Sequence, residues 1–212
     1  MCFSPSASFT ASALLGVIGV ATVAKTKNKK ALPLAVIPLI FALQQLIEGG
    51  LWLNILGSGR FTLLLTAFFL FFALFWWPAF VPFTVYVIET VPWRRRVLAV
   101  LSGVGVATGI YIYATYLLNP TSAVIMNHCI YYEHTTPYGM VGAVLYMCVT
   151  VGAGVISSRY MIKFLYTLLA VLAFIAWRIY LANFVSVWCF FAAVASGFIY
   201  YIQTSSRVKK KS

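Results

Sequence analysis

Acidic residues are nearly absent from this chain, which has no Asp and three Glu among 212 residues. Histidine is scarce as well, with two residues. Seven-span membrane hydrolases that bind zinc through three His and one Asp would lack their ligands here, so that class of enzyme is a poor match. Charged residues make up 8% of the chain, whereas soluble domains carry roughly 25%. A soluble globular protein is therefore excluded.

The cysteines lack a redox-motif spacing, and the last apolar segment lacks a lysine. No C-x-x-C spacing occurs among the four cysteines, which gives a thioredoxin-like or quinone-linked dithiol mechanism little support. The last apolar segment, residues 184–203, contains no Lys, so a retinal Schiff base of the rhodopsin kind lacks its nucleophile. Residues 1–5 contain no basic side chain, so we expect no cleavable signal peptide.

Long apolar runs dominate what is present. Hydrophobic residues make up 63% of the chain, and each run approaches or exceeds the roughly 20 residues that cross a bilayer as a helix. The runs cover residues 6–24, 32–56, 61–91, 97–118, 138–156, 164–183 and 184–203. The third run is too long for one perpendicular crossing, and Pro78 and Pro82 predict a kink in it. We predict an all-α polytopic membrane protein, a compact bundle of seven transmembrane helices in a single domain over residues 1–212.

The cations predict the orientation of that bundle. All but two of them lie next to the same ends of the apolar runs. The exceptions are Arg60, which flanks the opposite ends, and Arg178, which lies inside a run. The rest fall in four clusters, at residues 25–30, 94–96, 159–163 and 207–211. Because cytoplasmic loops collect Lys and Arg, the N-terminus is predicted outside and residues 204–212 form a basic cytosolic tail.

The membrane also accounts for the formal net charge of +12. Juxtamembrane cations meet anionic lipid headgroups on the cytosolic side, so the partners we expect are the bilayer and these headgroups, and nucleic acid is not among them. A bacterial inner (plasma) membrane is the expected location. Residues 119–137 are the one substantial non-helical segment, and we expect this outer loop to fold over the mouth of the bundle.

Three motifs are spread over nearly the whole chain. The first is Met1-Cys2-Phe3-Ser4 followed by Ala7-Ser8-Phe9, the second is Gln44-Gln45 with Glu48-Gly49 and Trp52, and the third is Val185-Ser186-Val187-Trp188-Cys189-Phe190-Phe191. Together they resemble a family of small, uncharacterised multispan membrane proteins, mostly bacterial. The resemblance supports the membrane fold and implies no activity, because the family has none established.

Glu48 and Arg178 are charged residues that lie well inside predicted spans. Glu48 is about 12 Å and Arg178 about 8 Å below the outer boundary, at 1.5 Å per helical residue. An unpaired charge at such depth is costly, so these groups pair, neutralise or face water. The simplest prediction is that Glu48 faces Arg178 inside the bundle. A purely structural pair, a protonated Glu48 bonded to Gln45, and an Arg178 that reaches the outer surface are the alternatives.

Polar groups from separate segments converge on the outer end of the predicted bundle. Gln45, Glu48 and Trp52 share one helical face, with Gln44 one turn before Glu48. The topology places the outer loop and the start of the last span beside them. This predicts an outward-facing polar pocket, lined by Gln44, Gln45, Glu48, Trp52, His128, Tyr131, Arg178, Ser186 and Trp188.

Several functions fit such a pocket. The leading hypothesis is a sensor or binding protein for a small ligand or ion. The alternatives are a small solute transporter with a 3+1+3 helix arrangement and an intramembrane enzyme, with or without a metal. Donors for a metal ion exist in Cys2, His128, His134 and Glu48, although their spacing matches no established motif. A disulfide between Cys2 and Cys129 is the competing use of those thiols on an oxidising outer face.

Overall fold

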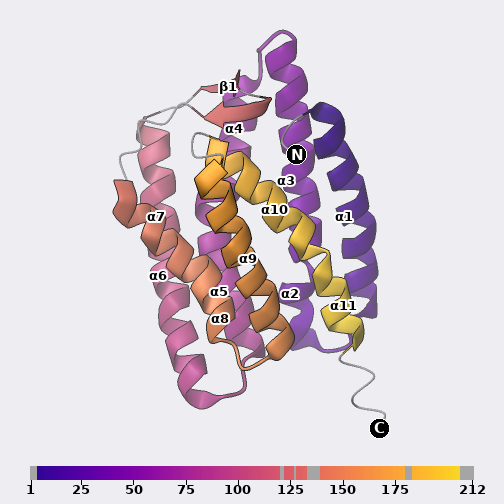
Figure 1. Ribbon diagram of the computed structural model, residues 1–212, viewed down its shortest axis with the longest axis vertical. Coiled ribbons are helices and arrows are strands. Elements are labelled where there is room, and N and C mark those ends of the chain that lie inside the picture. The colour runs from indigo at the N-terminus through magenta and orange to yellow at the C-terminus, as the bar shows by residue number, and fades with distance from the viewer. Residues whose placement is uncertain (1–3, 120–121, 127, 133–138, 180–182, 206–212) are drawn as a thin grey trace.

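The computed structural model describes residues 4–119, 122–126, 128–132, 139–179 and 183–205 (Figure 1). Its helices form an elongated bundle with a small β-hairpin at one end. We call this the hairpin end. The opposite end, where Lys29, Arg94 and Arg159 lie at helix starts, is the basic end. Of the helices in the described residues, six are long and apolar enough to cross a membrane, so the chain is an integral membrane protein.

The first two spans pack against each other along their length. Ser4 caps the start of helix α1 (Pro5–Lys25), because its Oγ accepts a hydrogen bond of 3.2 Å from the Ala7 N–H. The turn η1 (Lys29–Ala31) and helix α2 (Leu32–Ala35) lead into helix α3 (Ile37–Leu56). The Ser12 hydroxyl donates to the Ala42 carbonyl at 2.8 Å, across the α1–α3 interface. The two helices approach closely, so a Cβ at Gly19 would lie 2.6 Å from Leu39 Cγ.

The third span contains a change of helix type. Helix α4 (Thr62–Leu70) continues into the π-helical segment η2 (Phe71–Trp76) and then into helix α5 (Trp77–Ile88). In a π-helix the N–H of each residue bonds the carbonyl five residues earlier. Pro78 has no N–H, so the Ala73 carbonyl loses that donor. The Tyr146 hydroxyl replaces it and donates to the Ala73 carbonyl at 2.8 Å.

The fourth span and the hairpin follow. Helix α6 (Pro92–Leu118) packs along α5, and the strands β1 (Ala123–Met126) and β2 (Cys129–Tyr132) pair antiparallel, with Ala123 opposite Tyr132. His128 turns the hairpin with a positive φ of 58°. The strands contact the ends of α3, α4 and α10, and Tyr132 stacks on Phe69. The sequence predicted a non-helical segment here but no strand pairing.

The last three predicted spans form the remainder of the bundle. Helix α7 (Gly139–Met147), the π-helical segment η3 (Cys148–Gly152) and helix α8 (Ala153–Ile156) run in sequence, followed by helix α9 (Tyr160–Ile179). Helices α10 (Phe184–Ser196) and α11 (Phe198–Ser205) complete the fold. The predicted span 138–156 corresponds to an apolar helix, Val141–Ile156, that is shorter than the other six. A seven-span crossing and its orientation therefore stay predictions.

Candidate functional site

The polar side chains of α3 form a buried cluster. Gln44, Gln45 and Glu48 have no exposed surface, and Glu48 is bonded on both carboxyl oxygens. Gln45 Nε2 donates to Oε2 at 3.1 Å, and the Ser186 hydroxyl of α10 donates to Oε1 at 2.6 Å. Trp77 Nε1 donates to Gln44 Oε1 at 2.7 Å. The sequence predicted that this face of α3 looks into the bundle, and these contacts place it there, packed against α5 and α10.

Arg178 does not join this cluster. Its side chain is exposed, and its guanidinium carbon lies 5.8 Å from the centroid of the Trp177 ring. Within the described residues no ion pair links it to Glu48, which is bonded to Gln45 and Ser186 instead. The position differs from the predicted pair because the two residues occupy different faces: Glu48 faces α10, whereas Arg178 lies on the outer surface of α9 at its last turn.

The predicted metal donors are also dispersed. His128 is exposed at the tip of the hairpin, whereas Glu48 is fully buried. In the described part of the chain no three His, Cys, Asp or Glu side chains form a group that could hold a metal ion. Cys2 and His134 lie outside the described residues, so the predicted metal site stays untested at those two positions. Cys129 is a buried free thiol in this structure.

A large cavity lies between the helices that diverge from α8. Helices α7 and α9 meet at α8 and separate toward the hairpin end (Figure 1). Between them is a space of about 1010 Å³, walled by η2, η3 and α10 and reached by β2. Phe174 and Val144 line it and are 61% and 55% exposed, so the space opens on the flank of the bundle. We call this space the lateral crevice.

The wall of the lateral crevice is mostly apolar, with its polar groups at one end. Ala73, Val151 and Ala173 belong to the deep wall, and each is more than 90% buried. Tyr131, Trp177 and Asn183 line it toward the hairpin end. Asn183 Nδ2 donates to the Met126 carbonyl at 2.9 Å and so joins the start of α10 to the hairpin.

Few of the residues predicted to line the polar pocket line the lateral crevice. Tyr131 and Trp188 line it. The remaining seven do not: they are Gln44, Gln45, Glu48, Trp52, His128, Arg178 and Ser186. Sequence analysis missed most of the wall, because small apolar residues such as Ala170 and Ala173 carry no chemical signature.

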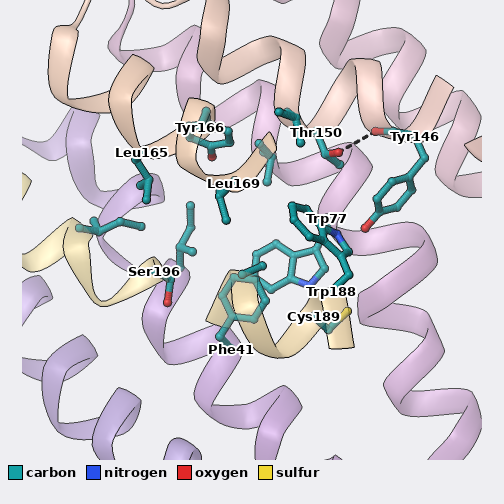
Figure 2. A pocket seen from close by; sticks show the side chains of 15 residues that line it. Phe41, Trp77, Tyr146, Thr150, Leu165, Tyr166, Leu169, Trp188, Cys189 and Ser196 are labelled. Carbon is teal, nitrogen blue, oxygen red and sulfur yellow. Dashed lines mark hydrogen bonds between the residues drawn. The ribbon is translucent and has the colours of Figure 1, made fainter. Parts of the chain in front are cut away.

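A second, smaller cavity lies deeper in the bundle. Its volume is about 50 Å³. Figure 2 shows Phe41, Trp77 and Trp188 near one side of it and Tyr166 near the other. Four residues line both this cavity and the lateral crevice, namely Tyr146, Val151, Trp188 and Cys189. The volume is sufficient for a few water molecules, since each needs roughly 10–15 Å³ on this measure.

Two irregular helical segments border the lateral crevice. Ala73 and Leu74 come from η2, and Cys148, Val151 and Gly152 come from η3. Each π-helical turn accommodates an extra residue and changes the direction of the side chains that follow, and such turns are frequent at functional sites. Both described π segments of this chain therefore lie on the same cavity. Nothing in the amino-acid pattern distinguished them from α-helix.

The basic end holds a second buried carboxylate, which sequence analysis overlooked. Glu89 joins the α5–α6 turn to the α8–α9 turn. Its oxygens accept hydrogen bonds from the N–H groups of Thr90, Val91 and Ser158 at 2.9, 2.9 and 2.7 Å, and from the Ser158 hydroxyl at 2.6 Å. Burial by itself raises the pKa of Glu89, but these hydrogen bonds outweigh it and lower the pKa from 4.5 to about 2. The carboxylate therefore stabilises the point from which α7 and α9 diverge.

Comparison with known proteins gives a family and no function. A model of a family of unknown function, DUF6629, matches residues 1–212. The sequence-based expectation of an uncharacterised family is confirmed by this match. No curated protein and no solved structure matches the chain. The interpretation of the site therefore rests on its own geometry.

Proposed function

Because the chain belongs to DUF6629, whose description states no activity, we propose its function from the lateral crevice: it is an intramembrane binding protein for a small lipophilic molecule. The observation that carries the proposal is a cavity of about 1010 Å³ that opens on the flank of a membrane bundle. Ligand pockets occupy roughly 300–1,000 Å³. The crevice is thus large enough to hold a drug-sized molecule or a lipid chain.

The apolar wall favours a ligand that comes from the bilayer. Val144 and Phe174 flank the opening and sit on helices whose exposed surfaces are apolar. A molecule dissolved in hydrocarbon reaches such an opening without crossing water, and it leaves no polar group unsatisfied on entry. The polar pocket predicted from the sequence fits less well, since Glu48, Gln44 and Gln45 are packed with no exposed surface.

Binding without chemistry is the simplest role for this geometry. The described residues that line the lateral crevice include no acidic side chain and no His. Two thiols, Cys148 and Cys189, line it, and the part of the wall that the structure describes holds no His or acid that would activate them as nucleophiles. A transporter would require a site reachable from both sides of the membrane. The lateral opening supports a receptor, sensor or carrier for a lipophilic molecule in preference to either.

Photolabelling in vesicles tests this function. The protein is reconstituted in phosphatidylcholine with a trace of phosphatidylcholine that carries a diazirine in its acyl chain, and labelled residues are mapped by mass spectrometry. Ala173 is 4% exposed and Val151 8%, so lipid around the bundle does not reach them. We expect label at both. Val171, on the same helix and 51% exposed, reports the surrounding lipid.

A matched pair of variants isolates the cavity. Ala173→Trp fills the lateral crevice and should abolish label at Val151 while label at Val171 persists. Val171→Trp places the same side chain on the lipid-facing surface and should leave label at Val151 unchanged. Label confined to exposed positions in the wild-type protein, with none on the crevice wall, would contradict the proposed function.

A further inference from the structure

A permanent positive charge stands at the rim of the lateral crevice. Trp177 lines the crevice and is half exposed, and the Arg178 guanidinium lies 5.8 Å from its ring centroid. That is within the range of a cation–π contact. No hydrogen bond or ion pair ties Arg178 to another residue that the structure describes. The guanidinium of Arg178 therefore has no counter-ion among the described side chains.

Arg178 is separate from the basic clusters that predict the topology. In the described part of the chain, those clusters lie at the basic end, whereas Arg178 ends α9 at the hairpin end. Arg60 is the other cation of the hairpin end, in the turn between α3 and α4. It rests 5.5 Å from the Phe61 ring centroid in a similar contact, but neither residue lines the lateral crevice. The two arginines are therefore matched in setting and differ in their relation to the cavity.

The lateral crevice is apolar at its deep wall and more polar at its hairpin end, which matches the two parts of an amphiphile. Its deep wall is built from Ala73, Val151 and Ala173, and its hairpin end carries Tyr131 and Trp177. No hydrogen bond of the Tyr131 hydroxyl joins it to another described residue. Tyr and Trp are typical of the boundary between hydrocarbon and headgroups. A chain inside the crevice would thus carry its headgroup beside Tyr131, Trp177 and the charge of Arg178.

From this arrangement we infer that the lateral crevice selects an amphiphile with an anionic headgroup. The inference rests on the proposed function and adds the charge of the ligand. An acidic headgroup supplies the counter-ion that Arg178 lacks among the described side chains, and no acidic side chain among the described residues of the crevice wall repels it. A zwitterionic or neutral headgroup has no such gain. A fatty acid and an anionic phospholipid share this chemistry, and the test separates them.

Three diazirine probes with the same acyl chain measure the selection: phosphatidylcholine, phosphatidylglycerol and the free fatty acid. The readout is the label at Val151 and Ala173 relative to label at Val171, for each probe. We expect about a two- to fivefold preference for an anionic probe, the size of one partly exposed charge pair. Arg178→Gln should reduce that ratio to one, and Arg178→Lys should restore it in part, because it keeps the charge. Arg60→Gln should leave the preference unchanged.

The outcomes are distinguishable. A preference lost in Arg178→Gln and kept in Arg60→Gln supports the inference, and the better anionic probe identifies the source as phospholipid or fatty acid. Equal label from all three probes, with label still abolished by Ala173→Trp, overturns the anionic selection and leaves the proposed function standing. An identical loss of preference in both arginine variants also overturns it, since a surface charge effect would then suffice. Absence of crevice label from every probe overturns both.

Discussion

Two of the three glutamates show how environment decides the role of one residue type. Glu48 lies within a span, has no exposed surface and is bonded to Gln45 and Ser186. Both donors are neutral. The bond from Ser186 joins α10 to α3, so Glu48 contributes to the packing between these two helices. Glu89 lies between spans, and its partners are backbone N–H groups and a hydroxyl that come from two different turns.

The acid stability of the protein should depend on Glu89. Its pKa is lowered to about 2 from 4.5, so its stabilising effect is complete above pH 4.5 and is lost as the pH falls toward 2. We expect the midpoint of thermal unfolding in detergent to drop through this window. Because Gln does not titrate, the Glu89→Gln variant should lose less stability than the wild-type protein as the pH falls through this window. Its free energy of unfolding at neutral pH should be lower by roughly 1.5–3 kcal/mol, the usual effect of hydrogen bonds to a charged group.

Ser158→Ala provides a graded comparison. It removes one hydroxyl donor and keeps the N–H groups that bond Glu89, so the acid-dependent loss should shrink without vanishing. Ser102→Ala is the control, because that hydroxyl bonds only the Leu98 carbonyl of its own helix. Glu89→Gln and wild-type curves that stay parallel from neutral pH to pH 2 would show that Glu89 does not cause the acid-dependent loss of stability.

At the scale of elements, the wall of the lateral crevice depends on how closely α6 packs on η2 and α5. A Cβ at Gly105 would overlap the Pro78 carbonyl oxygen, and one at Gly109 would lie 2.8 Å from the Phe75 carbonyl oxygen. The neighbouring Tyr146 bonds the carbonyl that Pro78 leaves without a donor and lines both cavities. Prolines, glycines and a π segment are therefore parts of one local arrangement.

Gly105→Ala should separate these helices measurably. The added methyl group meets backbone, which cannot move aside as a flexible side chain can, so we expect a destabilisation of about 1–3 kcal/mol. Gly103→Ala is the matched control on the same helix, because its Cβ would have nothing within 4 Å and Ala is the better helix former. The midpoints of thermal unfolding of the two purified variants are compared. Equal midpoints for Gly105→Ala and Gly103→Ala would refute the close packing of α6 on α5.

At the scale of the whole molecule, the lateral crevice exists because α7 and α9 meet at α8 but do not pack against each other along their sides. Helix α9 packs against α8, η3 and α10. Near the hairpin end α7 and α9 stand apart, and the space between them is the lateral crevice. The orientation of this space in the membrane follows from the charge asymmetry, which predicts the hairpin end outside.

Accessibility labelling tests that orientation. Lys27 and Ser122 are both exposed and lie at opposite ends of the bundle. With a membrane-impermeant maleimide on intact cells, the Ser122→Cys variant should be labelled, and the Lys27→Cys variant should be labelled only after lysis. The exposed native Cys148 gives the background, which is measured first on the wild-type protein. Labelling of both variants from the same side would refute the predicted topology.

The sequence by itself determined the features that depend on local composition. Run length and the scarcity of charge identified a helical membrane protein, and the ranges of the predicted spans lie close to those of the helices. The polarity of Gln44, Gln45 and Glu48 required a face turned into the bundle, because hydrocarbon offers such groups no partner. The structure gives that face the partners it needs, Trp77 and Ser186. All of these conclusions follow from single segments and their solvent.

Only the tertiary structure decided which segments meet. It paired Glu48 with Ser186, left Arg178 on the rim of a cavity and brought Glu89 to Ser158 across 69 residues of sequence. It also created the lateral crevice from residues such as Ala173 and Val151, whose identity is ordinary for any apolar helix. A cavity is set by the relative positions of helices, and the packing of irregular surfaces fixes those positions. Hydrophobic periodicity fixes which face is buried but not which neighbour covers it or where a neighbour is missing.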